Sequence, residues 1–253
     1  KMLKNSAKPS AGIELMRKSG LLEIFMPELL EGEGVDQPVY HSHDVYAHAL
    51  RTVDAAPDDI RLAALFHDIG KPRKKMPDGH FYGHDIEGEK MVRTIMKRMK
   101  FSKAEIDRTA KLVRHHMFYY PVPDDEASDK EVEQYESKKW TDAAVRRFIA
   151  RVGEENIDDL FALRIADATA NPKTAFQPGE VELLQERISE VRAQDMALKV
   201  TDLAINGDDL KNLGVEPGPE MGEILGELLK EVIDDPSLNN KETLEKMVRK
   251  MVR

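Results

Sequence analysis

Apolar residues recur along most of the chain at intervals of three and four positions, the spacing that places them on one face of an α-helix. No convincing strand pattern occurs beyond a hairpin signal around residues 79–81, and no internal repeat is present. The sequence therefore predicts an all-α protein. The helices predicted from this pattern cover residues 10–18, 21–30, 45–53, 58–69, 87–99, 103–117, 141–152, 157–170, 180–199, 207–213, 219–234 and 241–252.

Three stretches interrupt the helical pattern. Residues 71–84 are rich in Pro, Gly, His and Lys and are expected to form a loop. Residues 121–138 are acidic and contain prolines, which predicts an exposed excursion, and residues 177–179 form a further break. We also expect three parts in the chain: a helical lead-in over residues 1–35, a main helical bundle over residues 36–176 and a smaller helical tail over residues 177–253.

The amino-acid composition indicates the size of the core and the expected location of the protein. The chain has 253 residues, 41% of them hydrophobic, which is enough for a packed core. Because cysteine is absent, neither disulfides nor thiolate metal sites can form, and a cytoplasmic location is expected. No apolar run approaches the roughly 18 residues of a membrane span, so no membrane partner is expected. The helical pattern is already under way at Lys1, which favours a piece of a longer protein.

Charge argues against a general affinity for nucleic acids. The formal net charge is −9, although a local basic surface can exist on an acidic protein. Basic residues are frequent over residues 93–114, where a solvated charged face is the favoured explanation. The aromatic residues 118–120 can stack on bases, but the edge of a core is the favoured interpretation. The apolar stripe in the C-terminal "KMVRKMVR" likewise favours packing over binding.

Three predicted helices carry a polar residue on their apolar face. Successive side chains lie about 100° apart around a helix. On this basis the polar residues on the apolar faces are His48, His67 and Asp167, each on a different helix. An unpaired carboxylate on such a face costs several kcal/mol. Inward polar groups on three separate helices are expected to compensate one another, and a divalent cation does this best.

His67 is followed directly by Asp68, and adjacent side chains diverge by about 100° around a helix. Both reach one ion only if it lies over the helix end, which Gly70 is expected to define. Imidazole and carboxylate ligands together suit Mn, Fe, Ni, Zn or, less well, Mg. Each residue alone has an ordinary explanation, such as a satisfied core histidine or an aspartate paired with Arg164. The combination, and the confinement of all eight histidines to residues 41–116, favours a metal site.

The spaced set of histidines and aspartates resembles the HD superfamily of metal-dependent phosphohydrolases. His48 in "YAHALRTV" matches the first histidine of that family, His67–Asp68 match its signature pair, and Asp167 in "LRIADATA" matches its final aspartate. The resemblance implies that residues 36–176 form an HD-domain helical bundle in which these four residues hold a divalent metal ion.

Members of this superfamily that hold a second metal, or bind phosphate through histidines, have further histidines between the HD pair and the final aspartate. His84 in "FYGHDIEGEKMV" fits one such place, and His116 in "LVRHHMF" fits the other, with His115 as its rival. The resemblance implies that His84 and His116 bind a second ion or contact substrate phosphate, and it makes His115 a candidate for substrate binding. Asp68 is expected to act in catalysis by orienting water as well as binding metal. Lys71 is expected to meet phosphate, with a cation at a helix C-terminus as its structural alternative.

Two further segments resemble bacterial CCA-adding tRNA nucleotidyltransferases, which are close relatives of bacterial poly(A) polymerases. "SAKPSAGIELMRKSGLLEIFMPEL" is similar to the neck-like segment that leads into their HD domain, and "LAINGDDLKNLGVEPGPEMGEILGELL" is similar to their tail. In the second segment, Asp208 or Asp209 is expected to cap a short helix rather than bind metal. The Gly-Ser stretch and strand-borne aspartate pair of the transferase head are missing here, so an N-terminal nucleotidyltransferase domain is expected only in a full-length parent.

The resemblance also implies a function. The implied cofactor is a divalent ion (Mn, Ni, Co, Fe, Zn or Mg), and the implied partner is tRNA or a nucleotide carrying a 2′,3′-cyclic phosphate, a 2′-phosphate or a phosphate monoester. An active hydrolase region of a tRNA-processing enzyme is the favoured hypothesis, because the ligand set is complete. A tRNA-binding scaffold with a structural or vestigial metal site is the alternative. A free-standing HD nucleotidase is a weaker one, which the tail resemblance disfavours.

Overall fold

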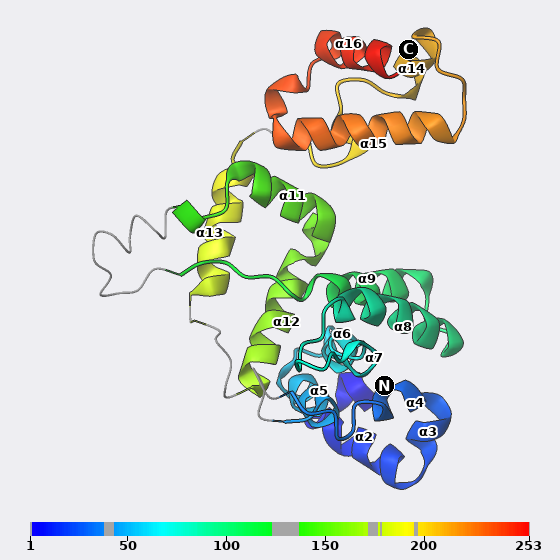
Figure 1. Cartoon of the computed structure of the whole chain (residues 1–253), viewed down its shortest axis with the longest axis vertical. Coiled ribbons are helices and arrows are strands. Elements are labelled where there is room, and N and C mark those ends of the chain that lie inside the picture. Colours follow the sequence, from blue (N-terminus) through cyan, green and yellow to red (C-terminus); the bar gives the residue numbers. More distant parts are fainter. Residues whose placement is uncertain are drawn as a thin grey trace, which may run out of the picture. The chain divides into compact units, whose positions relative to one another are not determined.

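The computed structural model describes residues 2–37, 43–122, 137–171, 177, 179–194 and 197–252. Within these residues every regular element is an α-helix or a 3₁₀-helix, and no strand is present (Figure 1). The prediction of an all-α protein is confirmed. A search of the same residues finds no helix with the length and apolar character that crossing a membrane requires.

The chain divides into two compact units. Unit 1 comprises Lys1–Tyr119 and Glu155–Gln177, and unit 2 comprises Tyr120–Glu154 and Pro178–Arg253. The α-helices of unit 1 are α1 (Met2–Asn5), α2 (Pro9–Lys18), α3 (Leu21–Phe25), α4 (Pro27–Leu30), α5 (Val45–Ala55), α6 (Arg61–Phe66), α7 (Lys71–Lys74), α8 (His84–Arg98), α9 (Lys103–His115) and α12 (Ile157–Ala170). Those of unit 2 are α11 (Asp142–Val152), α13 (Glu180–Arg192), α14 (Gly207–Asn212), α15 (Pro219–Asp234) and α16 (Lys241–Met251). Short 3₁₀ turns are η1 (Glu154–Asn156), η2 (Val200–Asp202) and η3 (Pro236–Leu238).

These units divide the chain differently from the three parts expected from the sequence. Residues 120–154 group with the C-terminal helices rather than with the main bundle. The functional limits of lead-in, HD domain and tail stay a prediction.

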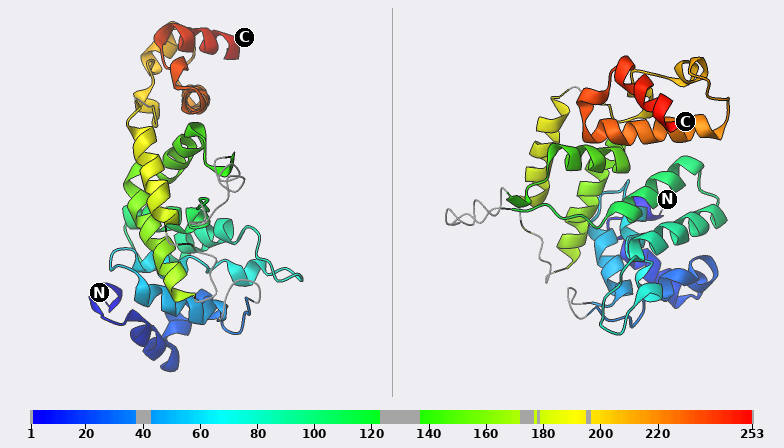
Figure 2. Two further views of the ribbon diagram at one scale, coloured as in Figure 1. Left: turned by 90° about the vertical axis from the view of Figure 1, so that its left-hand side faces the viewer. Right: turned by 45° about the horizontal axis from the view of Figure 1, so that its top comes forward.

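Local capping signals fix where the main helices of unit 1 begin. The Asp44 side chain accepts a hydrogen bond from the backbone N–H of Ala47 (2.7 Å) and starts α5. Ser102 and Glu105 form a reciprocal capping box at the start of α9. In unit 1, α5 packs against α6 and α12, and α8 packs beside α9 (Figures 1 and 2). This packing brings the polar faces predicted from the sequence toward one another.

The prediction of a single helix over residues 21–30 is wrong, because the structure has two helices there. The first, α3, ends at Phe25, and α4 begins at Pro27. Between them Met26 has φ −142° and ψ 59°, outside the helical region. The cause is steric, since a proline ring disfavours helical geometry in the residue before it.

The end of the predicted helix 58–69 also differs. Regular helix covers only Arg61–Phe66, and α7 lies inside the predicted loop 71–84. Gly70 has φ −80° and ψ −15°, so it does not end a helix by turning left-handed. A Cβ on Gly70 would instead overlap the backbone carbonyl oxygen of His84 and lie 2.7 Å from the backbone nitrogen of Gly88. The glycine is needed because the start of α8 packs directly against this turn.

Smaller differences concern the segments between helices. The hairpin signal near residues 79–81 corresponds to a tight turn in which the N–H of Met76 donates to the carbonyl of His80 (2.8 Å), with no strands flanking it among the described residues. Helix α13 ends at Arg192 rather than at residue 199. Most of the predicted acidic excursion, residues 123–136, lies outside the described residues.

In unit 2 the C-terminal helices form a core of their own. Leu210, Leu228 and Leu244, from α14, α15 and α16, are fully buried in it. The cap of α14 is Asn206, whose side chain accepts from the backbone of Asp208 and Asp209. Of the two aspartates expected to cap this helix, Asp209 takes part by accepting from the Asn206 N–H (2.9 Å), which completes a capping box.

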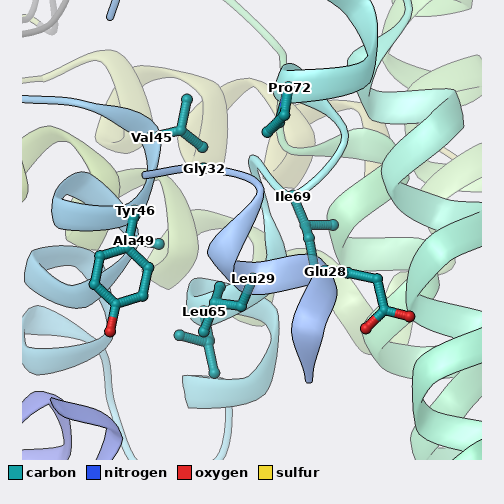
Figure 3. A pocket seen from close by; sticks show the side chains of 9 residues that line it. All are labelled: Glu28, Leu29, Gly32, Val45, Tyr46, Ala49, Leu65, Ile69 and Pro72. Atoms are coloured by element: carbon teal, nitrogen blue, oxygen red, sulfur yellow. The ribbon is translucent and has the colours of Figure 1, made fainter. Parts of the chain in front are cut away.

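A small cleft of unit 1 lies where the lead-in meets the bundle (Figure 3). Tyr46 and Ala49 of α5 line one side, and Leu29 of α4 and Leu65 of α6 lie close by. Its lining is mostly apolar and shares no residue with the polar cluster described below. The cleft therefore reflects how the lead-in packs on the bundle.

The close approach at Gly70 can be tested by substitution. Gly70→Ala is expected to lower the free energy of unfolding by about 1–3 kcal/mol, because backbone atoms must move to admit the methyl group. Gly222→Ala in α15 is the matched control, since the methyl group added there would meet no neighbouring atom within 4 Å. It is expected to be neutral or stabilising by about 0.5–1 kcal/mol. Denaturant unfolding of both variants measures this, and equal stability of the two would contradict the packing role.

Candidate metal centre

Six polar side chains converge inside unit 1. The residues are His48 on α5, His67 and Asp68 on the turn after α6, His84 at the first position of α8, His116 directly after α9, and Asp167 on α12. The first five are at least nine-tenths buried, and the Asp167 side chain is 17% exposed. The structure thus brings together all six residues that the sequence marked as metal-ligand candidates, while their role as ligands stays a prediction.

The six side chains form two groups of three. In the first group, the Nε2 atom of His48 lies 2.8 Å from Asp167 Oδ1 and 3.2 Å from His67 Nε2. His67 Nε2 lies 3.6 Å from the same Asp167 oxygen. Within this group all three candidate ligand atoms lie within 4.8 Å of one another, close enough to share one cation.

The second group comprises Asp68, His84 and His116. Asp68 Oδ1 lies 3.4 Å from His84 Nε2 and 3.6 Å from His116 Nε2. The other oxygen of the same carboxylate, Oδ2, lies 3.2 Å from Nε2 of His67 in the first group. Asp68 therefore connects the two groups, with one oxygen toward each.

Backbone carbonyls fix the orientation of three of the imidazoles. Nδ1 of His67, His84 and His116 lies 2.9, 2.8 and 2.7 Å from the carbonyl oxygen three residues earlier in the chain. Because a carbonyl oxygen only accepts, each Nδ1 carries the hydrogen in these contacts. Each Nε2 is then the atom directed into the cluster. This arrangement, with one ring nitrogen bonded to the backbone and the other turned inward, is typical of metal-ligating histidines.

The spacing of the Nε2 atoms tests whether a cation fits. The Nε2 atoms of His48 and His67 are 3.2 Å apart, and those of His84 and His116 are 3.3 Å apart. Two neutral imidazoles cannot both present lone pairs to each other at that distance without repulsion. Each pair therefore needs a proton or a cation between its nitrogens, and the nearby carboxylates supply the compensating negative charge. The donor set of the two groups suits a divalent metal ion.

Charges within the cluster perturb its pKa values. Burial alone would lower the pKa of His67, but the negative charges of Asp68 and Asp167 outweigh it and raise this pKa to about 10. Burial alone would raise the pKa of Asp68, but the charges of His67 and Lys71 hold it well below its usual range. Burial lowers the pKa of His116, which keeps that imidazole neutral near pH 7. In the absence of a cation, a proton on His67 and the charge of Lys71 thus offset the two carboxylates.

Lys71 contacts the cluster directly. Its Nζ lies 2.6 Å from Asp68 Oδ2, and its side chain is buried. The expectation that Lys71 lies in a loop is wrong, because it is the first residue of the four-residue helix α7. Its Nζ also donates to Oε1 of Gln37 (2.6 Å), a buried residue that sequence reasoning did not single out. No motif or periodicity marks Gln37, so only the fold reveals this contact.

The structure shows where the residues of two alternatives lie that the sequence left open. His116 belongs to the second group, whereas His115 belongs to neither and is half-buried beside it in sequence. Arg164 Nη1 lies 3.7 Å from Asp167 Oδ2, so the ordinary aspartate–arginine pairing exists. The shorter contact of Asp167, however, is the one to His48 at 2.8 Å. The arginine therefore accompanies the cluster rather than replacing it.

An all-α bundle that gathers a histidine–aspartate pair with further buried histidines defines a metal-dependent, hydrolase-type class of domain. The chain belongs to the HD domain family, whose model matches residues 39–171 and thus contains all six clustered residues. The family predicted from the sequence is confirmed.

Within this family, the chain is similar to several known proteins. The chain is 31% identical to the A-adding tRNA nucleotidyltransferase of Deinococcus radiodurans over 88% of its own length and 50% of the relative. It is 30% identical to the CC-adding tRNA nucleotidyltransferase of Thermus thermophilus, over 86% of the chain and 47% of the relative. A shorter match, 36% identical over 43% of the chain and 28% of the relative, is to the multifunctional CCA protein of Herminiimonas arsenicoxydans. The chain thus spans about half the length of the first two relatives.

The raised pKa of His67 predicts a link between metal binding and protons. Since this pKa is about 10, His67 is protonated at pH 7 in the metal-free chain. A cation that binds to Nε2 of His67 must displace that proton. The apparent affinity for Mn²⁺ is therefore expected to rise up to about tenfold per pH unit between about pH 7 and 9. Calorimetric titrations in two buffers of different ionisation enthalpy should reveal release of about one proton per ion. Binding that is independent of buffer and pH would contradict this.

Proposed function

We propose that this chain is a metal-dependent phosphohydrolase that acts on phosphate esters of nucleotides or RNA ends. The observation that carries the proposal is the pair of buried ligand groups connected through Asp68, with one carboxylate oxygen toward each group. A divalent ion bound there would supply Lewis acidity for attack of water on a phosphate ester.

The residues of the chain take distinct roles in this proposal. His48, His67, Asp68 and Asp167 hold one cation, and His84 and His116 complete a second position or contact the phosphate. Asp68 accepts a hydrogen bond from the attacking water and so orients it. Lys71, whose ammonium lies 2.6 Å from Asp68, pairs with a phosphoryl oxygen as negative charge builds on it.

The relatives support a place in tRNA processing. Two of them are named as tRNA nucleotidyltransferases, and the similarity runs through nearly nine-tenths of this chain. We therefore propose that this chain serves as the HD-containing part of such a protein, with tRNA or its ends as substrate. In this proposal the nucleotide-adding activity belongs to a separate N-terminal domain of a full-length parent.

Removal of a cluster residue tests the hydrolase. The substrate is 2′,3′-cyclic AMP, assayed with Mn²⁺, Ni²⁺, Co²⁺ and Mg²⁺ in turn. His67→Ala and Asp68→Asn are each expected to lower kcat/KM at least about a hundredfold, because each removes a ligand that both the charge balance and the water position require. Circular dichroism checks that the helices persist. Hydrolysis that survives in both folded variants would reject these roles, and a folded wild-type chain that binds tRNA but never hydrolyses would favour the scaffold alternative.

The adjacent histidines 115 and 116 offer a matched comparison. His116→Ala is expected to lower hydrolysis at least about tenfold, since it removes a member of the second group. His115→Ala, which changes the neighbouring residue outside both groups, is expected to leave kcat/KM within about twofold. Steady-state kinetics on the two purified variants decides the matter. A larger loss for His115→Ala would show that the wrong neighbour has been assigned to the site.

A further inference from the structure

Two aromatic rings are held together on the loop that leads into the metal centre. The rings of His80 and Tyr82 stack with centroids 5.2 Å apart and an interplanar angle of 21°. Tyr82 is 69% exposed, so its ring is not part of a core. Neither the metal-ligand set nor the proposed hydrolysis step uses these rings.

The loop that carries the rings is ordered by its own hydrogen bonds. The N–H of Met76 donates to the carbonyl of His80 (2.8 Å), and the N–H of His80 donates to Asp78 Oδ1 (3.0 Å). Gly79 and Gly83 have φ of 84° and 74°, conformations that glycine adopts without strain. The stacked pair is therefore presented on a defined turn, which reduces the entropy lost when a ligand binds.

The residue between the two rings ties the loop to the cluster. The carbonyl oxygen of Phe81 accepts from Nδ1 of His84 (2.8 Å), one of the candidate metal ligands. The Phe81 ring lies beneath Lys71, whose Nζ is 5.6 Å from the ring centroid. A ligand held on His80 and Tyr82 would accordingly lie next to the segment that orients His84.

The same region carries basic side chains. Helix α7 and the residue after it supply Arg73, Lys74 and Lys75. Arg73 pairs with Glu31 through two contacts of 2.8 and 2.7 Å. Lys74 and Lys75 have no ion pair with any other residue that the structure describes. Lys75 directly precedes Met76, whose N–H pairs with His80, so cationic and aromatic groups lie at one turn.

We propose that His80 and Tyr82, on the loop that leads to His84, form a stacking subsite for the base of a nucleotide or of an RNA end. Aromatic rings beside lysines are the combination with which proteins hold single-stranded nucleic acid, because rings stack on bases and cations meet the phosphates. The inference rests on the proposed function, whose substrate it specifies as a phosphate ester that bears a base. Stacking of this kind tolerates all four bases.

Binding measurements without metal test the subsite apart from hydrolysis. The full chain is titrated with AMP and with ribose 5-phosphate in the presence of EDTA. Dissociation constants are obtained from the changes in NMR chemical shifts. AMP is expected to bind about tenfold more tightly than ribose 5-phosphate, as expected for one base stacked on an aromatic side chain. Tyr82→Ala should remove most of that preference, and Tyr82→Phe, which keeps the ring, should retain it.

Phe25→Ala is the matched control, because it removes another exposed ring, from α3, a helix that supplies nothing to the cluster. It should leave the preference for AMP unchanged.

Equal binding of AMP and ribose 5-phosphate by the wild-type chain, or a full preference in both Tyr82→Ala and His80→Ala, would overturn the subsite. An active hydrolase without the preference rejects the subsite alone, whereas an inactive chain that keeps it rejects only the hydrolase. In an active chain, Tyr82→Ala should raise KM for 2′,3′-cyclic AMP about tenfold and leave kcat within about twofold.

Discussion

The buried carboxylate of Asp68 is the constraint on which the rest of unit 1 depends. It is 1% exposed, and an ionised carboxylate at such a position is very costly unless it is paired. Lys71 lies 2.6 Å from one of its oxygens, and histidines of both ligand groups lie within 3.6 Å of one or the other. The packing of α5, α6, α8 and α9 must keep these partners in place. A fold that merely filled the same volume with apolar residues would not need this arrangement.

Helix ends supply the groups that orient the imidazoles. His67 and His116 directly follow α6 and α9, and each donates to a carbonyl in the last turn of its helix. Carbonyls in a last turn have no intrahelical partner, so they are free to accept from a side chain. His84 begins α8 and donates instead to the carbonyl of Phe81 in the preceding loop. The histidines are thus positioned by backbone geometry as well as by packing.

The candidate metal centre and the C-terminal core lie in different units of the chain. Unit 1 contains all six metal-ligand candidates, and unit 2 contains a separate core built from the C-terminal helices. The similarity to tRNA nucleotidyltransferases extends over both units, because it covers more than four-fifths of the chain. If the proposed hydrolysis is correct, the presence of the metal-ligand candidates and of a helical tail in one chain fits a substrate larger than a free nucleotide. The proposed stacking subsite would then hold a base at the end of that substrate, whichever base it is.

The sequence by itself determined the all-α class, the approximate position of most helices and the inward faces of His48, His67 and Asp167, because helical periodicity is a local property of the chain. It could not decide between His115 and His116, since neighbouring residues on a helix point in different directions and only packing against α8 selects one. It also missed the reason for Gly70 and the contact of Lys71 with Gln37. Both depend on segments that are distant in sequence and meet only in the folded chain, where non-local packing decides which atoms touch.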